Sequence, residues 1–200
     1  MTRQPSRNWR RLLAGLGLAT VLALGGCAAT GTPYQPASAS NKIKGGYSET
    51  QLASDRYRVT FEGNSLTSRD TVEGYLLYRS ADLTLAQGYD WFSIVQRETE
   101  HRVERRVEPD PLYRPWYGSA YAYWLPEWRY YGRPYGWRSW YPYGGGPFWT
   151  SHIDVRTVEQ FEATAEIVMH RGPKPEGNGK SFDARDVVAK LGPKIERPKP

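Results

Sequence analysis

RYRVTFEGNSLTSRDTVEGYLLYRSADLTLAQGYDWFSIV, residues 56–95, has the pattern of a strand, a helix and a second strand in succession. In its first part the apolar Tyr57, Val59 and Phe61 alternate with polar residues. A period of two is typical of a strand with one buried face. Gly63 and Asn64 are turn formers and end this pattern. The stretch therefore begins with a half-buried strand.

The segment after this turn has the spacing of a helix. Thr67, with Asp70 three residues later, predicts the start of the helix, and Gly88 predicts its end. Two apolar stripes run along the helix on opposite sides. The first is formed by Val72, Tyr75, Leu76, Leu83 and Ala86, and the second by Leu77, Ala81 and Leu85. A helix that is apolar on both flanks is expected to be covered on both flanks.

Three further strands are expected around this unit. Residues 47–53 form a hairpin with residues 56–62 through Ser54 and Asp55. Residues 89–95 are apolar on both faces, which predicts a central strand that continues into the charged residues 96–107. Apolar residues share one parity from Ile153 to Met169, which predicts a long antiparallel strand with one solvent-exposed face. Glu159 interrupts this series, so a bulge or bend is expected near it.

A short helix closes the domain. Asp183 is its expected cap, and Gly192 with Pro193 its expected end. The predicted fold is therefore α+β with two layers: a small antiparallel or mixed sheet of about four strands, one long helix and a short C-terminal helix. It occupies residues 47–192 as one domain, followed by a Pro- and Lys-rich tail at 193–200.

The first 26 residues have the layout of a signal peptide. Four arginines precede thirteen uncharged residues, a run too short to cross a bilayer as a helix. The residues Leu24-Gly25-Gly26-Cys27 resemble the lipobox of bacterial lipoproteins, which implies that the Cys27 thiol is lipidated. The alternative is a secreted protein in which Cys27 is an ordinary thiol. Ala28, rather than aspartate, implies sorting to the outer membrane, with the domain facing the periplasm.

Residues 27–46 are predicted to be the acylated cysteine and a flexible tether. The segment is small and polar, contains Pro and Gly, and has no apolar period. Nineteen flexible residues would hold the domain about 25 Å from the lipid.

Three stretches carry a family resemblance: GYSETQLASDRYRVTFEGN, YRSADLTLAQGYDWF and the long final strand. Together they cover about residues 44–96 and 150–170. They resemble a group of uncharacterised proteobacterial lipoproteins whose helix ends closer to RAAELTL, from which residues 79–85 differ conservatively. This resemblance implies a fold and an envelope location, and it brings no catalytic residues with it.

Charge argues against a nucleic-acid partner. Four of the 27 basic residues and none of the 21 acidic residues fall in the leader, which leaves a formal charge of +2 on the mature chain. Binding to phosphate groups requires a concentrated basic face.

Motifs for catalysis, cofactors and metals are largely missing. The sequence contains no G-x-S-x-G elbow and no glycine pattern for nucleotides, so no cofactor is expected. His152, Asp154 and His101 are the best metal candidates, but three histidines are a sparse supply and no metal site is predicted. Several carboxylates crowd the predicted hairpin and alternate with arginines, which is typical of an ion-paired surface. They are Glu98, Glu100, Glu104, Glu162 and Glu166.

The unusual feature is an insertion at 109–149, which contains nine of the 15 tyrosines and six of the eight tryptophans. One interpretation is a flexible loop that joins two strands, or a loop folded back over the helix. The other is a contact surface for a partner, because Tyr, Trp and Arg dominate interface hot spots and aromatic faces stack on sugars. The candidate contact residues are Trp116, Tyr117, Tyr123, Trp124, Trp128, Tyr130, Tyr131, Trp137, Trp140 and Tyr141. Replacing 112–148 by a short turn should leave the domain folded, unless these aromatics cover the second flank of the helix.

These observations favour a non-enzymatic outer-membrane lipoprotein that is anchored through its lipid. Its partner would be peptidoglycan, another glycan or another envelope protein. The alternative is a periplasm-facing enzyme that acts on peptidoglycan or glycan, with the hairpin carboxylates as acid and base.

Overall fold

The computed structural model describes residues 30–95, 115–133, 136–140, 142–144 and 160–199. Its strands are β1 (Gly46–Ala53), β2 (Arg56–Asn64), β3 (Trp91–Val95), β4 (Glu127–Gly132), β5 (Gly136–Trp140), β6 (Gln160–His170) and β7 (Ser181–Asp183). Its helices are α1 (Arg69–Ala86) and α2 (Ala184–Leu191), with 3₁₀ turns η1 (Ser119–Tyr121), η2 (Pro142–Gly144) and η4 (Gly192–Lys194).

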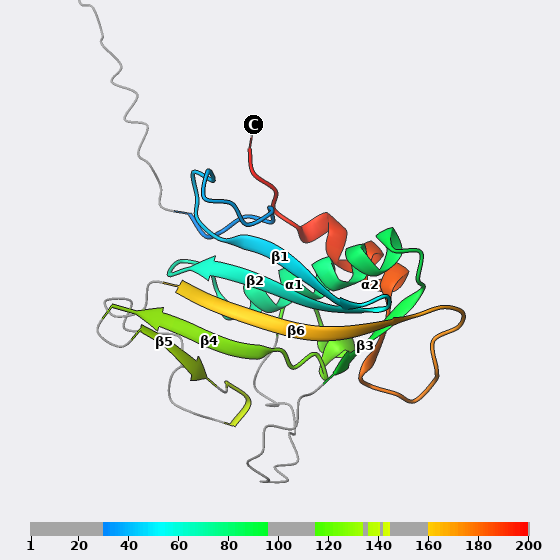
Figure 1. Cartoon of the computed structure of the whole chain (residues 1–200). Coiled ribbons are helices and arrows are strands. Elements are labelled where there is room, and N and C mark those ends of the chain that lie inside the picture. Colours follow the sequence, from blue (N-terminus) through cyan, green and yellow to red (C-terminus); the bar gives the residue numbers. More distant parts are fainter. Residues whose placement is uncertain (1–29, 96–114, 134–135, 141, 145–159, 200) are drawn as a thin grey trace, which may run out of the picture.

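All seven strands belong to one antiparallel sheet (Figure 1). The main order is β1-β2-β6-β3-β7, while β4 also pairs with β6 and β5 pairs with β4. The α+β class is confirmed. The expected number of about four strands is wrong, because two strands lie within the aromatic insertion and a third, β7, precedes the last helix.

Strand β4 continues the line of β3 along one edge of β6. Val95 at the end of β3 pairs with Glu166, and Glu127 at the start of β4 pairs with Thr164. Both strands run antiparallel to β6, so β3 and β4 point in the same direction along it. The insertion is therefore part of the sheet rather than only a connector between two strands.

The hairpin of β1 and β2 is confirmed, and the burial of β2 alternates along its length as the sequence predicts. Tyr57, Val59 and Phe61 point into the core. In β6 the expected inward series is also buried, from Phe161 to Met169. The part of the predicted strand before Gln160, including the bend near Glu159, lies outside the described residues.

Helix α1 begins one residue later than expected. The Ser68 side chain, rather than that of Thr67, caps it by accepting a hydrogen bond from the Thr71 backbone N–H. Gly88 has a φ of 77°, which glycine adopts without strain, and follows the helix end as predicted. Both apolar stripes of the helix are largely buried, so the helix is covered on both flanks.

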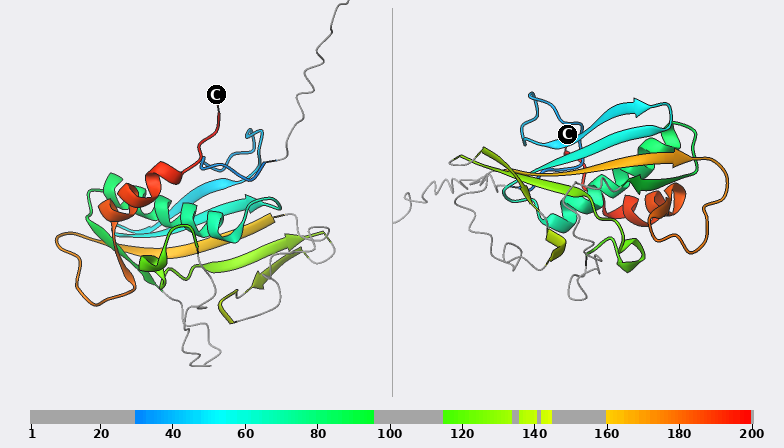
Figure 2. Two further views of the ribbon diagram at one scale, coloured as in Figure 1. Left: turned by 180° about the vertical axis from the view of Figure 1, so that it is seen from behind. Right: turned by 60° about the horizontal axis from the view of Figure 1, so that its bottom comes forward.

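Helices α1 and α2 lie on the same face of the sheet (Figure 2). Asp183 caps α2 by accepting from the Asp186 backbone N–H, as expected. Together the sheet and the helices form the two layers that the sequence predicts. Neither helix is long and apolar enough to span a bilayer, within the residues that the structure describes.

The expected flexible tether at 27–46 is wrong from Thr30 onward. Tyr34 is buried, and its ring contacts the rings of Tyr47, Tyr75 and Tyr78. Its backbone N–H donates to the Glu196 carbonyl at 2.8 Å. The segment therefore belongs to the domain, since a composition rich in small residues does not prevent one tyrosine from entering the core.

The domain also extends beyond its expected C-terminal limit of 192. Ile195 is buried, and the Glu196 backbone N–H donates to the Tyr75 hydroxyl at 3.1 Å. The start of the tail thus packs near Tyr75 in the middle of α1, where Tyr34 also packs.

Candidate functional site

A buried carboxylate in the second turn of α1 organises the aromatic insertion. The Glu73 side chain is fully buried, and its Oε1 accepts a hydrogen bond at 2.9 Å from Nε of Arg69, one helical turn earlier. A buried carboxylate is costly unless it is paired and hydrogen-bonded. The remaining acceptor capacity of Glu73 is met by the insertion.

Three aromatic side chains donate to this carboxylate. The Tyr117 hydroxyl donates to Oε2 at 2.5 Å, and Nε1 of Trp128 donates to Oε1 at 3.2 Å. The Tyr143 hydroxyl also donates to Oε1, at 3.3 Å. Nε1 of Trp124 donates to the backbone carbonyl of Glu73 at 3.0 Å. One residue of α1 therefore holds four aromatic residues that are up to 26 positions apart in the chain.

Burial and the neighbouring carboxylate keep the Tyr143 hydroxyl protonated. Burial raises the pKa of the Tyr143 hydroxyl well above its usual range, and the nearby Glu73 carboxylate raises it further. Tyr143 therefore remains a hydrogen-bond donor across the physiological pH range. Because Glu73 is enclosed by donors, this cluster is suited to holding the insertion against α1 rather than to reacting with a substrate.

The insertion also uses a glycine of α1. The Trp116 ring lies against Gly74, and a β-carbon built at Gly74 would overlap ring atoms of Trp116. Aromatic side chains of the insertion thus cover α1 around Glu73 and Gly74, and α2 also packs against this helix.

These contacts correct the expected contact surface. Tyr117, Trp124 and Trp128 are interior residues, so the hypothesis that they are exposed partner contacts is wrong for all three. Trp116 is half-buried and packs against the core. These side chains enter the core because α1 supplies both an apolar flank and an acceptor for their N–H and O–H groups.

The other candidate contact residues differ in exposure. Tyr130, Tyr131 and Trp140 are half-buried, and Tyr141 lies outside the described residues. Tyr123 and Trp137 remain exposed, at 46% and 40%. Only these two present a largely free aromatic side chain in the described part of the insertion.

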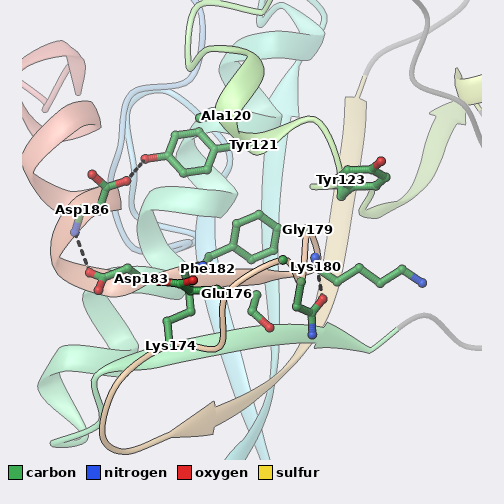
Figure 3. A pocket seen from close by; sticks show the side chains of 13 residues that line it. Ala120, Tyr121, Tyr123, Lys174, Glu176, Gly179, Lys180, Phe182, Asp183 and Asp186 are labelled. Carbon is green, nitrogen blue, oxygen red and sulfur yellow. Dashed lines mark hydrogen bonds between the residues drawn. The ribbon is translucent and has the colours of Figure 1, made fainter.

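Tyr123 borders an open cleft of about 900 Å³ between η1 and the loop that connects β6 with β7 (Figure 3). The lining residues of that loop and of the β7–α2 junction are Lys174, Glu176, Gly177, Asn178, Gly179, Lys180, Ser181, Phe182, Asp183 and Asp186. Ala120, Tyr121 and Tyr123 line the cleft from the insertion. The insertion therefore builds one wall of the cleft and the β6–β7 loop builds the other.

One wall of the cleft is held by a hydrogen bond. The Tyr121 hydroxyl donates to Asp186 Oδ2 at 2.9 Å (Figure 3). Burial alone would raise the pKa of the Asp186 carboxyl, but hydrogen bonds from Lys190 and Tyr121 outweigh it and lower the pKa. Asp186 is therefore ionised near neutral pH and fixes the Tyr121 ring.

The opposite wall depends on glycine. Gly177 has a φ of 75°, and the Tyr123 ring lies so close to Gly179 that a β-carbon at Gly179 would overlap it. The loop can approach Tyr123 because it has no side chain at this position.

Comparisons with models of protein families, with curated proteins and with solved structures find no match.

The hairpin carboxylates occupy a different place from the one expected. Glu162 and Glu166 lie on the predicted wet face of β6, yet both are buried. Arg129 holds Glu162 through two hydrogen bonds of 2.6 and 2.8 Å, and Arg56 forms an ion pair with Glu166. The prediction of ion pairing is confirmed for Glu162 and Glu166. The prediction that this face of β6 is exposed to solvent is wrong at both positions, because long arginine side chains cover them. Glu98, Glu100 and Glu104 lie outside the described residues.

Metal candidates are not found in the described part of the chain, where no group of three or more His, Cys, Asp or Glu side chains is placed to hold an ion. His101, His152 and Asp154 lie outside it.

Sequence reasoning missed Glu73 and the cleft. A signal for Glu73 was present, since this charged residue lies between the two apolar stripes of a helix expected to be covered on both flanks, four residues after Arg69. The cleft gave no such signal, because its two walls are about 55 residues apart in the chain.

Proposed function

We propose that the protein is a lipid-anchored outer-membrane protein that faces the periplasm, and that its domain is a non-enzymatic binding module. The observation that carries this proposal is the short sequence separation between Cys27 and Thr30, the first residue that the structure describes. Cys27 ends the lipobox-like residues Leu24-Gly25-Gly26-Cys27, and Thr30 is already hydrogen-bonded to the domain: its carbonyl accepts from Nδ2 of Asn64 at 2.9 Å.

The spacing between Cys27 and Thr30 limits how far this part of the domain can lie from the lipid. Only Ala28 and Ala29 lie between Cys27 and Thr30. An extended chain covers at most about 3.6 Å per residue, so the three steps from Cys27 to Thr30 span roughly 10 Å at most. The domain would thus lie directly on the membrane surface, closer than the 25 Å that a tether ending at 46 would allow.

The end of the sheet next to Thr30 has suitable side chains for this surface. Asn64 pairs with Gln160, which pairs with Tyr131, which pairs with Trp137. At about 4.8 Å per strand, Trp137 lies roughly 14 Å across the sheet from Asn64. Tryptophan and tyrosine favour the headgroup region of a bilayer.

Leu66 adds an apolar contact at the same end. It follows Asn64 in the turn after β2 and is 51% exposed. We therefore propose that the end of the sheet carrying Thr30, Leu66 and Trp137, called here the anchor end, rests on the lipid headgroups.

Binding is favoured over catalysis by the state of the carboxylates. An acid–base pair must reach its substrate, whereas Glu73, Glu162 and Glu166 are buried and paired with arginines. The open cleft, with an exposed aromatic residue at its rim, is a more suitable place for a partner. Peptidoglycan, another glycan or an envelope protein remains the partner class, and the mature charge of +2 argues against nucleic acid.

Metabolic labelling with an alkyne fatty acid tests the anchor. The wild-type chain should be labelled and fractionate with the outer membrane, while Cys27→Ser should remain an unlabelled precursor, because the serine hydroxyl is not the nucleophile that the lipid transferase uses. An Ala28→Asp variant should be labelled but shift to the inner membrane. Mature wild-type protein without label would contradict the proposal.

The enzymatic alternative is tested by replacing Glu98, Glu100, Glu162 and Glu166 with alanine. A phenotype lost in variants that still fold and still bind their partner would favour the enzyme over the binding module.

A further inference from the structure

The cleft lies at the end of the molecule opposite the anchor end. Strand β6 has eleven residues, and at about 3.4 Å per residue it spans roughly 34 Å from Gln160 to His170. Gln160 belongs to the anchor end, and the cleft loop follows His170 directly. With the anchor end on the membrane, the cleft would face away from it, into the periplasm.

We propose that this cleft binds a neutral sugar chain, of the kind that forms the glycan strands of the cell wall. The inference rests on the proposed role as an envelope binding module and names the class of its ligand. It is carried by three features of the cleft: an aromatic wall, an unsatisfied hydroxyl and a mixed charge.

The aromatic wall is exposed at its rim and fixed at its base. Tyr123 is 46% exposed, so one side of its ring is free to pack on the C–H face of a sugar. At its base, the ring centroids of Tyr121 and Phe182 lie 6.2 Å apart, and those of Phe182 and Trp124 lie 5.6 Å apart. Because these rings are held by the core, a ligand would meet a preformed surface.

The unsatisfied hydroxyl belongs to Ser181, a lining residue that is 6% exposed. Its Oγ has no hydrogen-bond partner within the described chain, although buried polar groups nearly always have one. Nearby, Asn178 uses its Oδ1 to accept from the Lys180 backbone N–H, and its side-chain nitrogen makes no hydrogen bond within the described residues. A hydroxyl-rich ligand would supply partners for both groups.

The mixed charge argues against an anionic ligand. Lys174 and Lys180 are opposed by Glu176, Asp183 and Asp186 along the same walls. A phosphate site needs converging donors of one sign, whereas alternating acceptors and donors beside an aromatic ring are suited to the hydroxyl groups and C–H faces of a neutral saccharide.

Calorimetric titration tests the proposal. All residues of the described core lie between Tyr34 and Ile195, so a chain that begins at residue 28 keeps every one of them. The probes are a β-1,4-linked N-acetylglucosamine trimer and, as a second sugar, maltotriose. The variants are Tyr123→Ala and Ser181→Ala, with Trp137→Ala and Ser48→Ala as matched controls on exposed positions away from the cleft.

We expect the trimer to bind and both cleft variants to weaken it about tenfold, which is the size of effect that an aromatic contact or a hydrogen bond supplies. Ser181→Ala should leave Tm unchanged, since the hydroxyl makes no bond in the folded chain. The controls should bind as the wild type does.

If the wild-type chain binds neither sugar, the proposal is overturned. It is also overturned if the wild type and both cleft variants bind equally well. Loss of binding in Trp137→Ala would also overturn it by placing the sugar at the anchor end. Fatty-acid labelling of Cys27 is independent of this titration. A labelled chain that binds no sugar removes only the cleft ligand, and a sugar-binding chain without label removes only the anchor.

Discussion

The indole ring of Trp116 lies against the backbone of Gly74 in the second turn of α1, where a single methyl group would overlap it. Glycine in the interior of a helix normally costs about 1 kcal/mol relative to alanine. At this position the relation is reversed, because the missing β-carbon is what allows the aromatic insertion to pack on the helix.

Gly74→Ala should therefore destabilise the domain by about 1–3 kcal/mol, the usual cost of overpacking a core. Chemical denaturation followed by circular dichroism measures this. In a Trp116→Ala background the same change should be neutral or stabilising, since the ring is gone and only helix propensity remains. Equal effects of Gly74→Ala in the two backgrounds would show that Trp116 does not occupy this place.

Glu73→Ala should cost about 3–5 kcal/mol, as expected when one member of a buried ion pair is removed. Arg69, Tyr117, Trp128 and Tyr143 would each lose a hydrogen bond to the carboxylate. Glu49→Ala is the matched control, because Glu49 forms an ion pair with Arg79 at the surface and should cost less than about 1 kcal/mol. Similar losses for the two variants would contradict the role of Glu73 as the anchor of the insertion.

Two tryptophans of the insertion test which part of it belongs to the core: Trp124 is buried, and Trp137 is exposed. Trp124 is 1% exposed and its replacement by alanine should cost about 3–5 kcal/mol, whereas Trp137→Ala should cost less than about 1 kcal/mol. At roughly 2–4 °C per kcal/mol, the difference is easily seen in Tm.

Replacing residues 112–148 by a short turn should likewise unfold or strongly destabilise the domain. The sequence predicts survival of this deletion only if the aromatic residues do not cover α1. Trp116, Tyr117, Trp124 and Trp128 do pack on α1, around Glu73 and Gly74. A deletion variant with the Tm of the wild type would show that the buried aromatics contribute little.

Glu62 should make stability fall as pH rises. Burial raises the pKa of its carboxyl, the Glu162 carboxylate raises it further, and Arg129 partly opposes both. A carboxyl with a higher pKa in the folded chain holds its proton more tightly there, so the free energy of unfolding decreases as pH increases through that pKa.

Glu62→Gln should accordingly raise Tm at pH 7, and the gain should shrink as pH falls towards 4. Glu49→Gln serves as the opposite case, because it removes an ion pair and should lower Tm slightly at pH 7. A constant gain across this pH range would show that ionisation of Glu62 is not its cause.

The orientation on the membrane is open to site-specific labelling. Cys27 is the sole cysteine of the chain, so its acylation would leave no other thiol, and Leu66→Cys or Asn178→Cys would carry a single environment-sensitive fluorophore. On reconstitution into phospholipid vesicles the label at 66 should shift its emission to the blue, while the label at 178 should not. Identical emission at both positions would contradict the proposed anchor end.

Elements with a strong local pattern were predictable. The alternation in β2, the inward series of β6, the cap of α2 at Asp183 and the end of α1 at Gly88 all follow from the period of side chains or from backbone freedom. These are properties of neighbouring residues, and a sequence displays them directly. The lipobox-like residues before Cys27 are also local, and their interpretation as an anchor remains a prediction.

The insertion could only be resolved by the tertiary structure. Its aromatic residues follow no single period, so the sequence left a loose loop, a cover for the helix and a contact surface as alternatives. Trp124 and Trp128 became core residues because Glu73, about 50 positions earlier, offers them acceptors beside an apolar flank.

The sequence by itself thus determined the α+β class, the presence of α1 and α2, the end of α1, the cap of α2 and the strands whose faces alternate, because each rests on contacts between residues a few positions apart. Only the tertiary structure decided that residues 30–46 pack on the domain, that the insertion adds β4 and β5 to the sheet, and that a cleft opens beside Tyr123. These depend on pairings across tens of residues, such as Tyr34 with Glu196 and Tyr123 with Gly179. The free energy of such contacts is set by which surfaces meet in space, and no local pattern encodes it.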